Sequence, residues 1–205
     1  MAVIYSQNGV IIRQSFGGAV IGGRIYPTVK IGTQEWISEN LDFKFANLAI
    51  SNSFSGSSKV ANYYDEDEIT YGISGLKYGM LYNGTALRYI ESNTATLIPG
   101  WHIPTLADWE TLFTAVGGQS TAGLALKAIS SWNAGAGTDD YNFAAYAAGL
   151  YNGGYTNLGS QTAYWTATQD GSTQNKFILF SSSNSCSVNS SVLGLGFYIR
   201  LVRDT

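Results

Sequence analysis

The sequence predicts a single α+β domain, with helices in the middle of the chain and strands towards both ends. An amphipathic helix pattern begins at Thr105, and β-branched, strand-like segments stand at residues 24–31 and 197–202. Residues 141–199 contain only two charged side chains and consist of short apolar runs separated by Gly and Asn. Helices and strands that are segregated in this way are typical of α+β proteins. We see no internal repeat and no linker that would divide the 205 residues.

The N-terminal part predicts a β-hairpin. Residues 24–31 have the alternation and β-branched content of a strand, residues 32–34 form a turn, and residues 35–41 form a second strand. The Ser-, Asn- and Gly-rich residues 46–59 then predict a loop. We expect the strand near Pro27–Ile31 to pair with the one near Phe197–Val202, which would bring the chain ends together.

The clearest helix follows Thr105. Thr105 and Asp108 resemble a capping box in which Asp replaces the usual Glu, and Gly117-Gly118 supplies a stop. The apolar positions recur at the spacing of one helix face: Leu106, Trp109, Leu112, Phe113 and Val116. Weaker patterns predict helices at residues 85–91 and 122–129. After Ser130 the pattern predicts a loop-rich β half, with strands at residues 164–168, 176–180 and 197–202.

Composition excludes several classes of function. Charged residues make up 12% of the chain, against about 25% in typical domains. The net charge of −3 argues against a nucleic-acid partner, which requires clustered Lys and Arg. Apolar runs are too short for membrane insertion. The single cysteine, Cys186, allows neither an intrachain disulfide nor a four-cysteine zinc site. Abundant Gly, Ser, Asn and Tyr instead suit an uncharged contact surface.

Nine short motifs occur in a fixed order along the chain. They are WISENL (36–41), YDEDE (64–68), KYGMLYN (77–83), PGWHIPT (99–105), DWE (108–110), GTDDYNF (137–143), AGLY (148–151), YWTAT (164–168) and GFYIRLV (196–202). In this order they resemble the Fibrobacter succinogenes major paralogous domain. The resemblance assigns residues 28–205 to that domain and residues 1–27 to an N-terminal strand or extension. It implies a C-type-lectin-like fold, related to sulfatase-modifying factors, with two main helices and a loop-rich antiparallel β half.

The resemblance implies a binding scaffold, so we expect no enzyme activity, no cofactor and no metal. Family members occur on bacterial surfaces or in phage-borne proteins, and some proteins of this fold are the variable proteins of diversity-generating retroelements. The chain lacks a signal-peptide pattern and the paired cysteines of surface members, which favours a phage tail protein in the virion. The alternative is a bacterial cell-surface adhesin or polysaccharide-binding domain. Either would bind a cell-surface protein or glycan receptor, and a homo-oligomer stays open. A third hypothesis, a degenerate modifying enzyme, is opposed by the lone cysteine.

The serine-rich segment at residues 181–191 is the candidate binding face. Seven of its eleven residues are Ser, and apolar segments flank it on both sides. Small hydroxyl and amide side chains give adaptable hydrogen bonding, as in antibody loops. The alternative is a solvated hairpin without a ligand. We predict one exposed ligand-binding patch made of Gln169, Gln174, Asn175, Ser181, Ser183, Asn184, Ser185, Ser187, Asn189, Ser190 and Ser191. Exposed aromatic residues would assist it, with Tyr151, Tyr155 and Tyr164 as candidates.

The remaining reactive side chains favour structural roles. His102, the only histidine, lies within PGWHIPT and predicts a packed, hydrogen-bonded turn. Cys186 has no nearby base or cation in the sequence. The acidic run Asp65–Glu68 leaves two interpretations open, a solvated face and a calcium site, although it lacks the EF-hand spacing. Asp139-Asp140 predicts a turn cap. We expect the tryptophans to lie in the core, since four of the five fall within the motifs.

Overall fold

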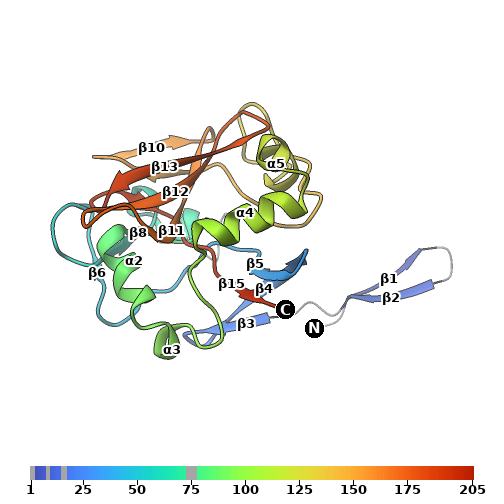
Figure 1. The fold of residues 1–205 in the computed structure, drawn as a ribbon, viewed down its shortest axis with the longest axis horizontal. Helices are drawn as coiled ribbons and strands as arrows, with labels where there is room; N and C mark the ends of the chain where they lie inside the picture. Colours follow the sequence, from blue (N-terminus) through green and yellow to red (C-terminus); the bar gives the residue numbers. More distant parts are fainter. Residues whose placement is uncertain (1–2, 8–9, 15–17, 73–77) are drawn as a thin grey trace.

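The computed structural model describes residues 3–7, 10–14, 18–72 and 78–205 (Figure 1). It confirms the predicted α+β class. The helices are α1 (Glu68–Tyr71), α2 (Gly84–Glu91), α3 (Thr94–Leu97), α4 (Leu106–Ala115) and α5 (Gln119–Leu126), with a short 3-10 turn at Tyr64–Glu66. Within the described residues, α2, α4 and α5 each have eight or more residues, whereas two main helices were expected.

A large sheet of nine strands runs through the domain (Figure 1). Its strand order is β13-β12-β11-β9-β14-β8-β7-β6, and β10 pairs with β9 outside this path. Most pairs are antiparallel, but β6 with β7 and β9 with β11 are parallel. The strands are β6 (Ala49–Ile50), β7 (Val60–Asn62), β8 (Leu81–Asn83), β9 (Ala148–Tyr151), β10 (Tyr155–Leu158), β11 (Thr162–Gln169), β12 (Gln174–Phe180), β13 (Cys186–Val192) and β14 (Gly196–Phe197).

A smaller four-stranded sheet joins the two ends of the domain. Its order is β15-β5-β4-β3, built from β3 (Gly18–Ile21), β4 (Arg24–Ile31), β5 (Gln34–Ile37) and β15 (Val202–Asp204). The predicted hairpin is present as β4 and β5. The predicted direct pairing of the first and last strands is wrong, because β5 lies between β4 and β15. The chain ends of the domain still meet in one sheet, and Thr205 N donates to Thr33 O at 3.1 Å.

The predicted strand at residues 197–202 is split between the two sheets. Phe197 belongs to β14 in the large sheet, and Val202 begins β15 in the small one. The chain crosses between the sheets at Arg200, which is fully buried. Its guanidinium donates to Asn40 Oδ1 at 2.7 Å and to the main-chain carbonyls of Ile37, Phe143 and Ala144. This side chain therefore ties the crossing to two distant loops.

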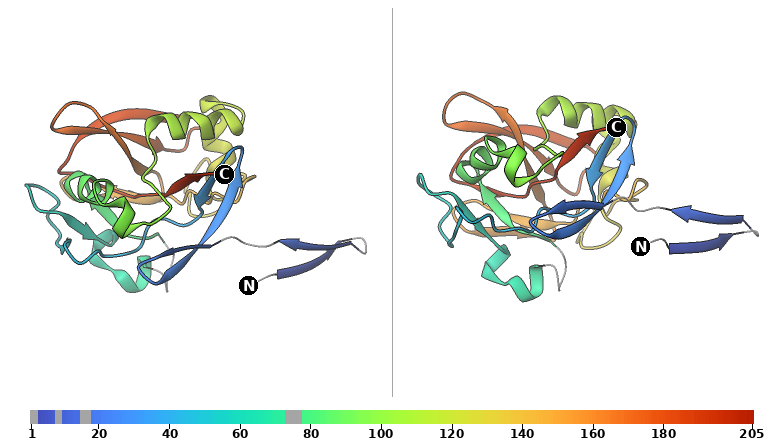
Figure 2. Two further views of the ribbon diagram at one scale, coloured as in Figure 1. Left: turned by 60° about the horizontal axis from the view of Figure 1, so that its bottom comes forward. Right: turned by 90° about the horizontal axis from the view of Figure 1, so that it is seen from below.

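A separate hairpin precedes the domain. β1 (Val3–Gln7) and β2 (Val10–Gln14) pair with each other and with no strand of the other sheets. The views in Figures 1 and 2 agree that this hairpin extends away from the body formed by the rest of the chain. The prediction that the two chain ends lie close together also concerns residue 1, which lies outside the described residues.

The side chains of the large sheet bury two apolar clusters, one on each face. The first contains residues of α4 and α5 together with Tyr164, Ile178 and Phe180 from the sheet. The second contains residues of α2 together with Ala163 and Trp165. Helices therefore cover the sheet from both sides, which gives three layers. All five tryptophans are buried, as predicted.

The helix boundaries follow local signals. Thr105 Oγ1 accepts from Asp108 N, and the Asp108 carboxylate accepts from Thr105 N, so the predicted capping box is present. The α4 helix ends before Gly117 and Gly118, whose φ values of 98° and 103° are unfavourable for other residues. The α5 helix begins three residues earlier than expected and ends before Lys127, which adopts an extended conformation.

Candidate ligand-binding face

The predicted site residues lie on β11, β12 and β13 and on the two turns that join these strands. Residues 170–173 connect β11 to β12, and residues 181–185, called here the serine turn, connect β12 to β13. β12 has seven residues, so the two turns stand about 20 Å apart at its opposite ends. The predicted residues therefore form an elongated face rather than one compact patch.

Exposure differs among these residues. Five side chains are exposed, five are half-buried, and Asn175 is buried. The exposed ones are Gln169, Ser183, Asn184, Ser187 and Asn189. The half-buried ones are Gln174, Ser181, Ser185, Ser190 and Ser191.

Strand alternation sorts the serines of β13 onto two faces of the sheet. Ser187, Asn189 and Ser191, called here the outer row of β13, lie on the face of the sheet opposite to α4 and α5. They lie beside the half-buried Leu179 and Phe177 of β12. On this row, Asn189 Nδ2 donates to Ser187 Oγ at 3.0 Å. The other face of β13 begins with the buried Cys186 and packs on the core under α4 and α5.

The prediction that Asn175 is an exposed ligand-binding residue is wrong. Asn175 is 1% exposed, and its amide Nδ2 donates to Thr166 O at 3.1 Å. Its Oδ1 accepts from Arg88 Nε of α2 at 2.9 Å. A buried amide that has its groups paired supports the structure, and Asn175 therefore fixes the start of β12.

The Arg88 side chain also binds main-chain carbonyls in and beside the turn between β11 and β12. Its Nη1 donates to Ser172 O at 2.6 Å, and its Nη2 donates to Gln174 O at 2.9 Å and Gly171 O at 3.4 Å. These acceptors are all carbonyl oxygens. The contacts that Arg88 makes with this turn therefore do not depend on the side chains of the turn.

Lys127 holds the serine turn in the same way. Its side chain is fully buried, and Nζ donates to Ser181 O and Ser183 O at 2.9 Å each and also to Gly135 O. The ammonium lies 4.8 Å from the centre of the Trp132 ring, close enough for a cation–π contact. Burial lowers the pKa of Lys127. The positive charge is compensated by carbonyl dipoles and a ring face.

The α5 helix also donates hydrogen bonds to main-chain carbonyls of the serine turn and of Cys186, the first residue of β13. Leu124 N donates to Asn184 O at 3.0 Å, and Gln119 Nε2 donates to Cys186 O at 3.0 Å. Gly123 makes this approach feasible, because a Cβ there would lie 2.8 Å from the Asn184 and Ser185 oxygens. The serine turn is therefore anchored at several carbonyls while Ser183 and Asn184 face solvent.

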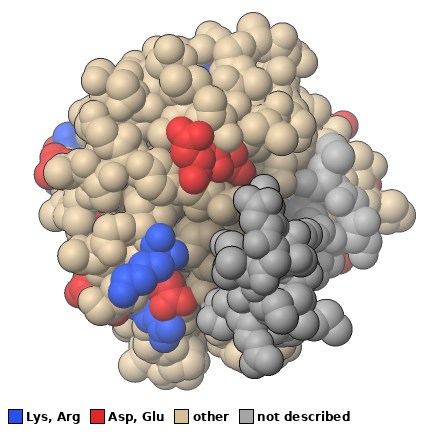
Figure 3. All heavy atoms as spheres, turned by 90° about the vertical axis from the view of Figure 1, so that its right-hand side faces the viewer, with Lys and Arg blue, Asp and Glu red and all other residues tan. Residues whose placement is uncertain are grey.

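The only two charged residues within 141–199, Asp170 and Lys176, pair with each other. Lys176 Nζ lies 2.9 Å from Asp170 Oδ2 and donates to Ser190 Oγ at 2.8 Å, and Ser190 Oγ in turn donates to Asp170. The hydrogen bond from Ser190 and the charge of Lys176 lower the pKa of Asp170. Ser190 is thus engaged within the protein. The rest of this face carries hydroxyl and amide groups. On the different side of the molecule drawn in Figure 3, the visible charged side chains also lie in a few separate groups.

The comparisons with known proteins identify the family. The Fibrobacter succinogenes major domain matches residues 29–203. The chain belongs to this family. The match agrees with the motif order described above. It covers the large sheet, β5 and all the helices of the described residues, whereas β3 and the first five residues of β4 precede it. Searches of curated proteins and of solved structures each found no match.

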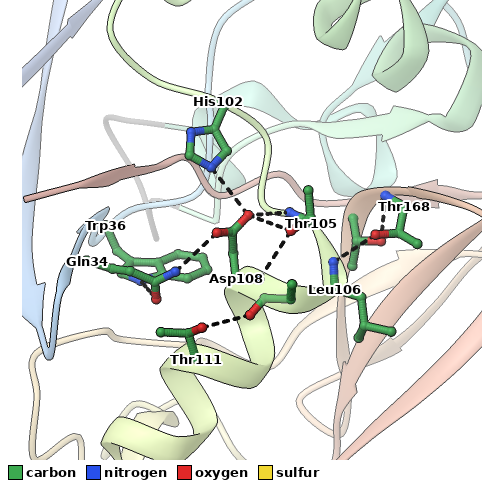
Figure 4. Close-up of polar contacts among 10 residues, drawn as sticks. Gln34, Trp36, His102, Thr105, Leu106, Asp108, Thr111 and Thr168 are labelled. Atoms are coloured by element: carbon green, nitrogen blue, oxygen red, sulfur yellow. Dashed lines mark hydrogen bonds and ion pairs between the residues drawn. The ribbon is translucent and has the colours of Figure 1, made fainter.

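In this family member, the PGWHIPT motif leads from α3 into α4, and its His102 pairs with Val202 of β15 (Figure 4). The main-chain N and O of His102 bond to Val202, each at 3.0 Å, and His102 Nε2 lies 3.3 Å from Asp108 Oδ2. The Asp108 carboxylate also accepts from Thr105 Oγ1 at 2.7 Å and from Gln34 Nε2 at 3.2 Å. His102 is therefore the predicted hydrogen-bonded turn residue, although its ring is half-exposed.

Charge pairing shifts both partners of this contact. The hydrogen bond to Asp108 raises the pKa of His102. Burial acts to raise the pKa of Asp108, but hydrogen bonds from His102 and Thr105 outweigh it and lower that pKa to about 2. The pair is charged in weakly acidic solution, and it links the small sheet to the first turn of α4.

The other reactive groups of the family domain have structural contacts. Cys186 is buried, and burial raises the pKa of its thiol, so it is not an activated nucleophile. In the acidic run, Asp67 caps α1 by accepting from Thr70 N at 2.9 Å. Asp139 Oδ1 accepts from Ala144 N at 2.8 Å, which confirms the predicted turn cap. Among the described residues, no three His, Cys, Asp or Glu side chains converge to hold a metal.

The aromatic candidates separate into two groups. Tyr164 is fully buried in the core, so its prediction as an exposed contact residue is wrong. Tyr151 and Tyr155 are half-buried, with Tyr151 4.5 Å from Phe54 and Tyr155 5.4 Å from Tyr64, measured between ring centres. None of the helices in the described part of the chain combines the length and apolar character needed to cross a membrane.

Sequence reasoning missed the two cations that position the turns. Lys127 follows an apolar helix and Arg88 lies within an amphipathic one. Both are far from the serine-rich segment in the sequence, so nothing in that segment points to them. A lysine at the end of an otherwise apolar stretch was the available signal for Lys127, because a buried charge requires partners.

Proposed function

We propose that this protein binds a ligand or cell-surface receptor through a variable face formed by the serine turn, the outer row of β13 and the β11–β12 turn. The supporting observation is that the scaffold holds both turns chiefly through main-chain carbonyls. Side chains on such turns can change without loss of the contacts that position them. Holding the turns in advance also lowers the entropic cost of binding.

The chemistry of the exposed groups indicates the kind of ligand. Ser183, Asn184, Ser187 and Asn189 offer hydroxyl and amide groups that both donate and accept hydrogen bonds. The nearby charges Asp170 and Lys176 are paired with each other. We therefore expect recognition of an uncharged polar surface, such as a glycan or a polar protein loop.

Three finer points of the proposal rest on the motif resemblance. They are a C-type-lectin-like fold, a place on a phage tail, and diversification of the C-terminal segment by a retroelement. An adhesin or polysaccharide-binding domain on a bacterial surface would use the same face, so the binding experiment below applies to either setting.

Two libraries of equal size test the proposal. The first randomises the four exposed positions Ser183, Asn184, Ser187 and Asn189, and the second randomises four buried polar positions, Asn83, Thr162, Thr166 and Asn175. Both are displayed on cells and scored for protease resistance. We expect most members of the first library and few of the second to remain folded, because surface changes usually cost within about 0.5 kcal/mol.

The same display measures binding. The folded members of the first library are selected on intact bacterial cells and on a glycan array. Selection should enrich different sequences at the four positions for different targets. Members that retain the starting residues should bind the same targets as the parent. The proposal fails if the first library unfolds as often as the second, or if replacing all four residues leaves the parent's binding to its target unchanged.

A further inference from the structure

The large sheet ends in a long and regular edge strand. β13 is the terminal strand of the nine, and its seven residues pair with β12 from Val192 opposite Gln174 to Cys186 opposite Phe180 without a register shift. Its sequence, CSVNSSV, contains no charge and no proline. Natural edge strands are normally blocked by charges, prolines, bulges or short length. β13 uses none of these devices.

The other terminal strands of the two sheets are shorter or carry charges. β6, at the opposite end of the large sheet, has two residues. β15, an edge of the smaller sheet, carries the exposed Arg203 and the charged Asp204. β3 (GAVI), the other edge of the smaller sheet, and β10 (YTNL), which pairs with β9 alone, carry no charge and no proline but have four residues each. β13 is therefore the longest uncharged edge strand among the described strands.

Hydrogen bonds across the sheet show which main-chain groups of β13 point outwards. Trp165 N donates to Tyr198 O, and Tyr198 N donates to Ala163 O, so Ala163 and Trp165 turn their main chains away from β12. Antiparallel ladders alternate bonded and non-bonded pairs. The β12 partners of these two residues, Leu179 and Phe177, therefore bond to β13.

It follows that Ser187 and Asn189, which stand opposite Leu179 and Phe177, bond inwards to β12. The intervening residues, Val188, Ser190 and Val192, direct N–H and C=O groups outwards. The contact from Gln119 Nε2 to Cys186 O at 3.0 Å agrees with this alternation. It also shows that α5 covers only the beginning of the edge.

We propose that β13 pairs antiparallel with β13 of a second copy of this chain, in a register centred on Asn189. Val188 would then exchange two hydrogen bonds with the partner's Ser190, and Ser190 with the partner's Val188. Asn189 would face itself in a non-bonded pair, the arrangement in which opposite side chains lie closest. This pairing joins two large sheets into one.

Charge and hydrogen bonding favour a second copy as the occupant. Twofold pairing places the central residue opposite itself, so a charge there would meet a like charge. The strand has no charge, and the exposed carboxamide of Asn189 carries both a donor and an acceptor, so it can bond to its symmetry mate. A seven-residue contact is small for a protein interface, so we expect a dimer that forms only at high concentration.

The dimer would have a direct consequence for binding. Antiparallel pairing places the rows Ser187, Asn189 and Ser191 of both copies on the same side of the continuous sheet. Two receptor-binding faces would then act together, which raises avidity without a new contact. The pairing itself goes beyond the proposed function and does not depend on it.

Sedimentation velocity of the full chain over a wide concentration range, without receptor, tests the proposal. The parent should show a reversible dimer. Asn189→Lys and Asn189→Glu should each be monomeric, and their equimolar mixture should recover a mixed dimer, identified by native mass spectrometry. Ser187→Lys is the matched control: it adds the same charge to the same row but away from the symmetry axis, and should retain the dimer.

Circular dichroism establishes that each variant is folded before it is compared. A parent that stays monomeric up to its solubility limit overturns the proposal. So does a dimer that persists unchanged in both Asn189 variants, or a charge-swapped mixture that does not pair. Loss of the dimer in Ser187→Lys as well would overturn the Asn189-centred register. Since no receptor is present, failure here is distinct from failure of the proposed binding function.

Discussion

Replacing Lys127 by Met tests whether a buried cation holds the serine turn. Methionine keeps an unbranched apolar side chain of similar length but removes the ammonium. The carbonyls of Gly135, Ser181 and Ser183 then lose their common donor. The cation–π contact with Trp132 is lost at the same time.

The magnitude follows from two opposing effects. Hydrogen bonds to a charged donor contribute about 1.5–3 kcal/mol each, and three are lost. Removing a buried charge recovers part of this, because its desolvation cost also disappears. Water that reaches the exposed side of the turn also replaces part of the lost hydrogen bonding, which reduces the net loss in stability. We expect a net loss of about 2–4 kcal/mol in the free energy of unfolding, or roughly 5–12 °C in melting temperature for a domain of this size.

Thermal denaturation measures the global effect, and hydrogen exchange measures the local one. Exchange should increase most in residues 181–186, and receptor binding should weaken although no exposed side chain has changed. Lys176→Met is the control, since Lys176 pairs with Asp170 at a partly exposed site and should cost within about 1 kcal/mol. A Lys127→Met protein with unchanged melting temperature and unchanged hydrogen exchange in the serine turn would refute the role of Lys127 in holding that turn.

Three further predictions concern individual side chains. Because pairing with Asp108 raises the pKa of His102, the contribution of His102 to stability is fully present below pH about 6.5 and is lost as pH rises through the folded-state pKa. Because the pKa of Asp108 is lowered, the contribution of Asp108 is present above pH about 4 and is lost towards pH 2. His102→Ala should therefore cost most between these limits, by less than about 1 kcal/mol because the ring is half-exposed, and a difference in melting temperature that is larger at pH 8 than at pH 5 would contradict this assignment. Asn175→Ala should cost about 1–3 kcal/mol in chemical denaturation, since it leaves buried partners unpaired, while Gln169→Ala should stay within about 0.5 kcal/mol; equal effects would argue against the burial of Asn175. The Cys186 thiol should resist iodoacetamide in the native chain and react after unfolding, and rapid native labelling would show that it is accessible.

Local sequence signals anticipated the parts of the fold that are determined within a few residues. The capping box of Thr105 and Asp108, the glycine stop after α4, the β4–β5 hairpin and the turn cap at Asp139 each join groups that are close along the chain. The motif order also indicated the family, which the match over residues 29–203 confirms. The burial of the tryptophans followed from their places within those motifs.

The sequence did not determine how these pieces meet. The segments at residues 24–31 and 197–202 both contain β-branched residues, but only the tertiary structure shows that β5 lies between β4 and β15. Apolar patterning leaves the choice of pairing partner open. Sequence reasoning predicts Asn175 and Tyr164 as surface residues, yet distant elements cover them. Burial of a polar residue depends on whether a partner reaches it, and that partner was Arg88, 87 residues away.

The candidate site shows the same division. Composition alone located the uncharged, hydroxyl-rich segment and predicted that much of it faces solvent, as Ser183, Asn184, Ser187 and Asn189 do. Tertiary structure decided what holds it: the Lys127 ammonium reaches carbonyls 54 and 56 residues away. Main-chain carbonyls have the same chemistry in every residue, so such contacts leave no trace in the sequence of the segment they hold. The exposure of β13 as a free edge is likewise a property of the whole sheet, since a strand becomes an edge only when the order of all its neighbours is fixed.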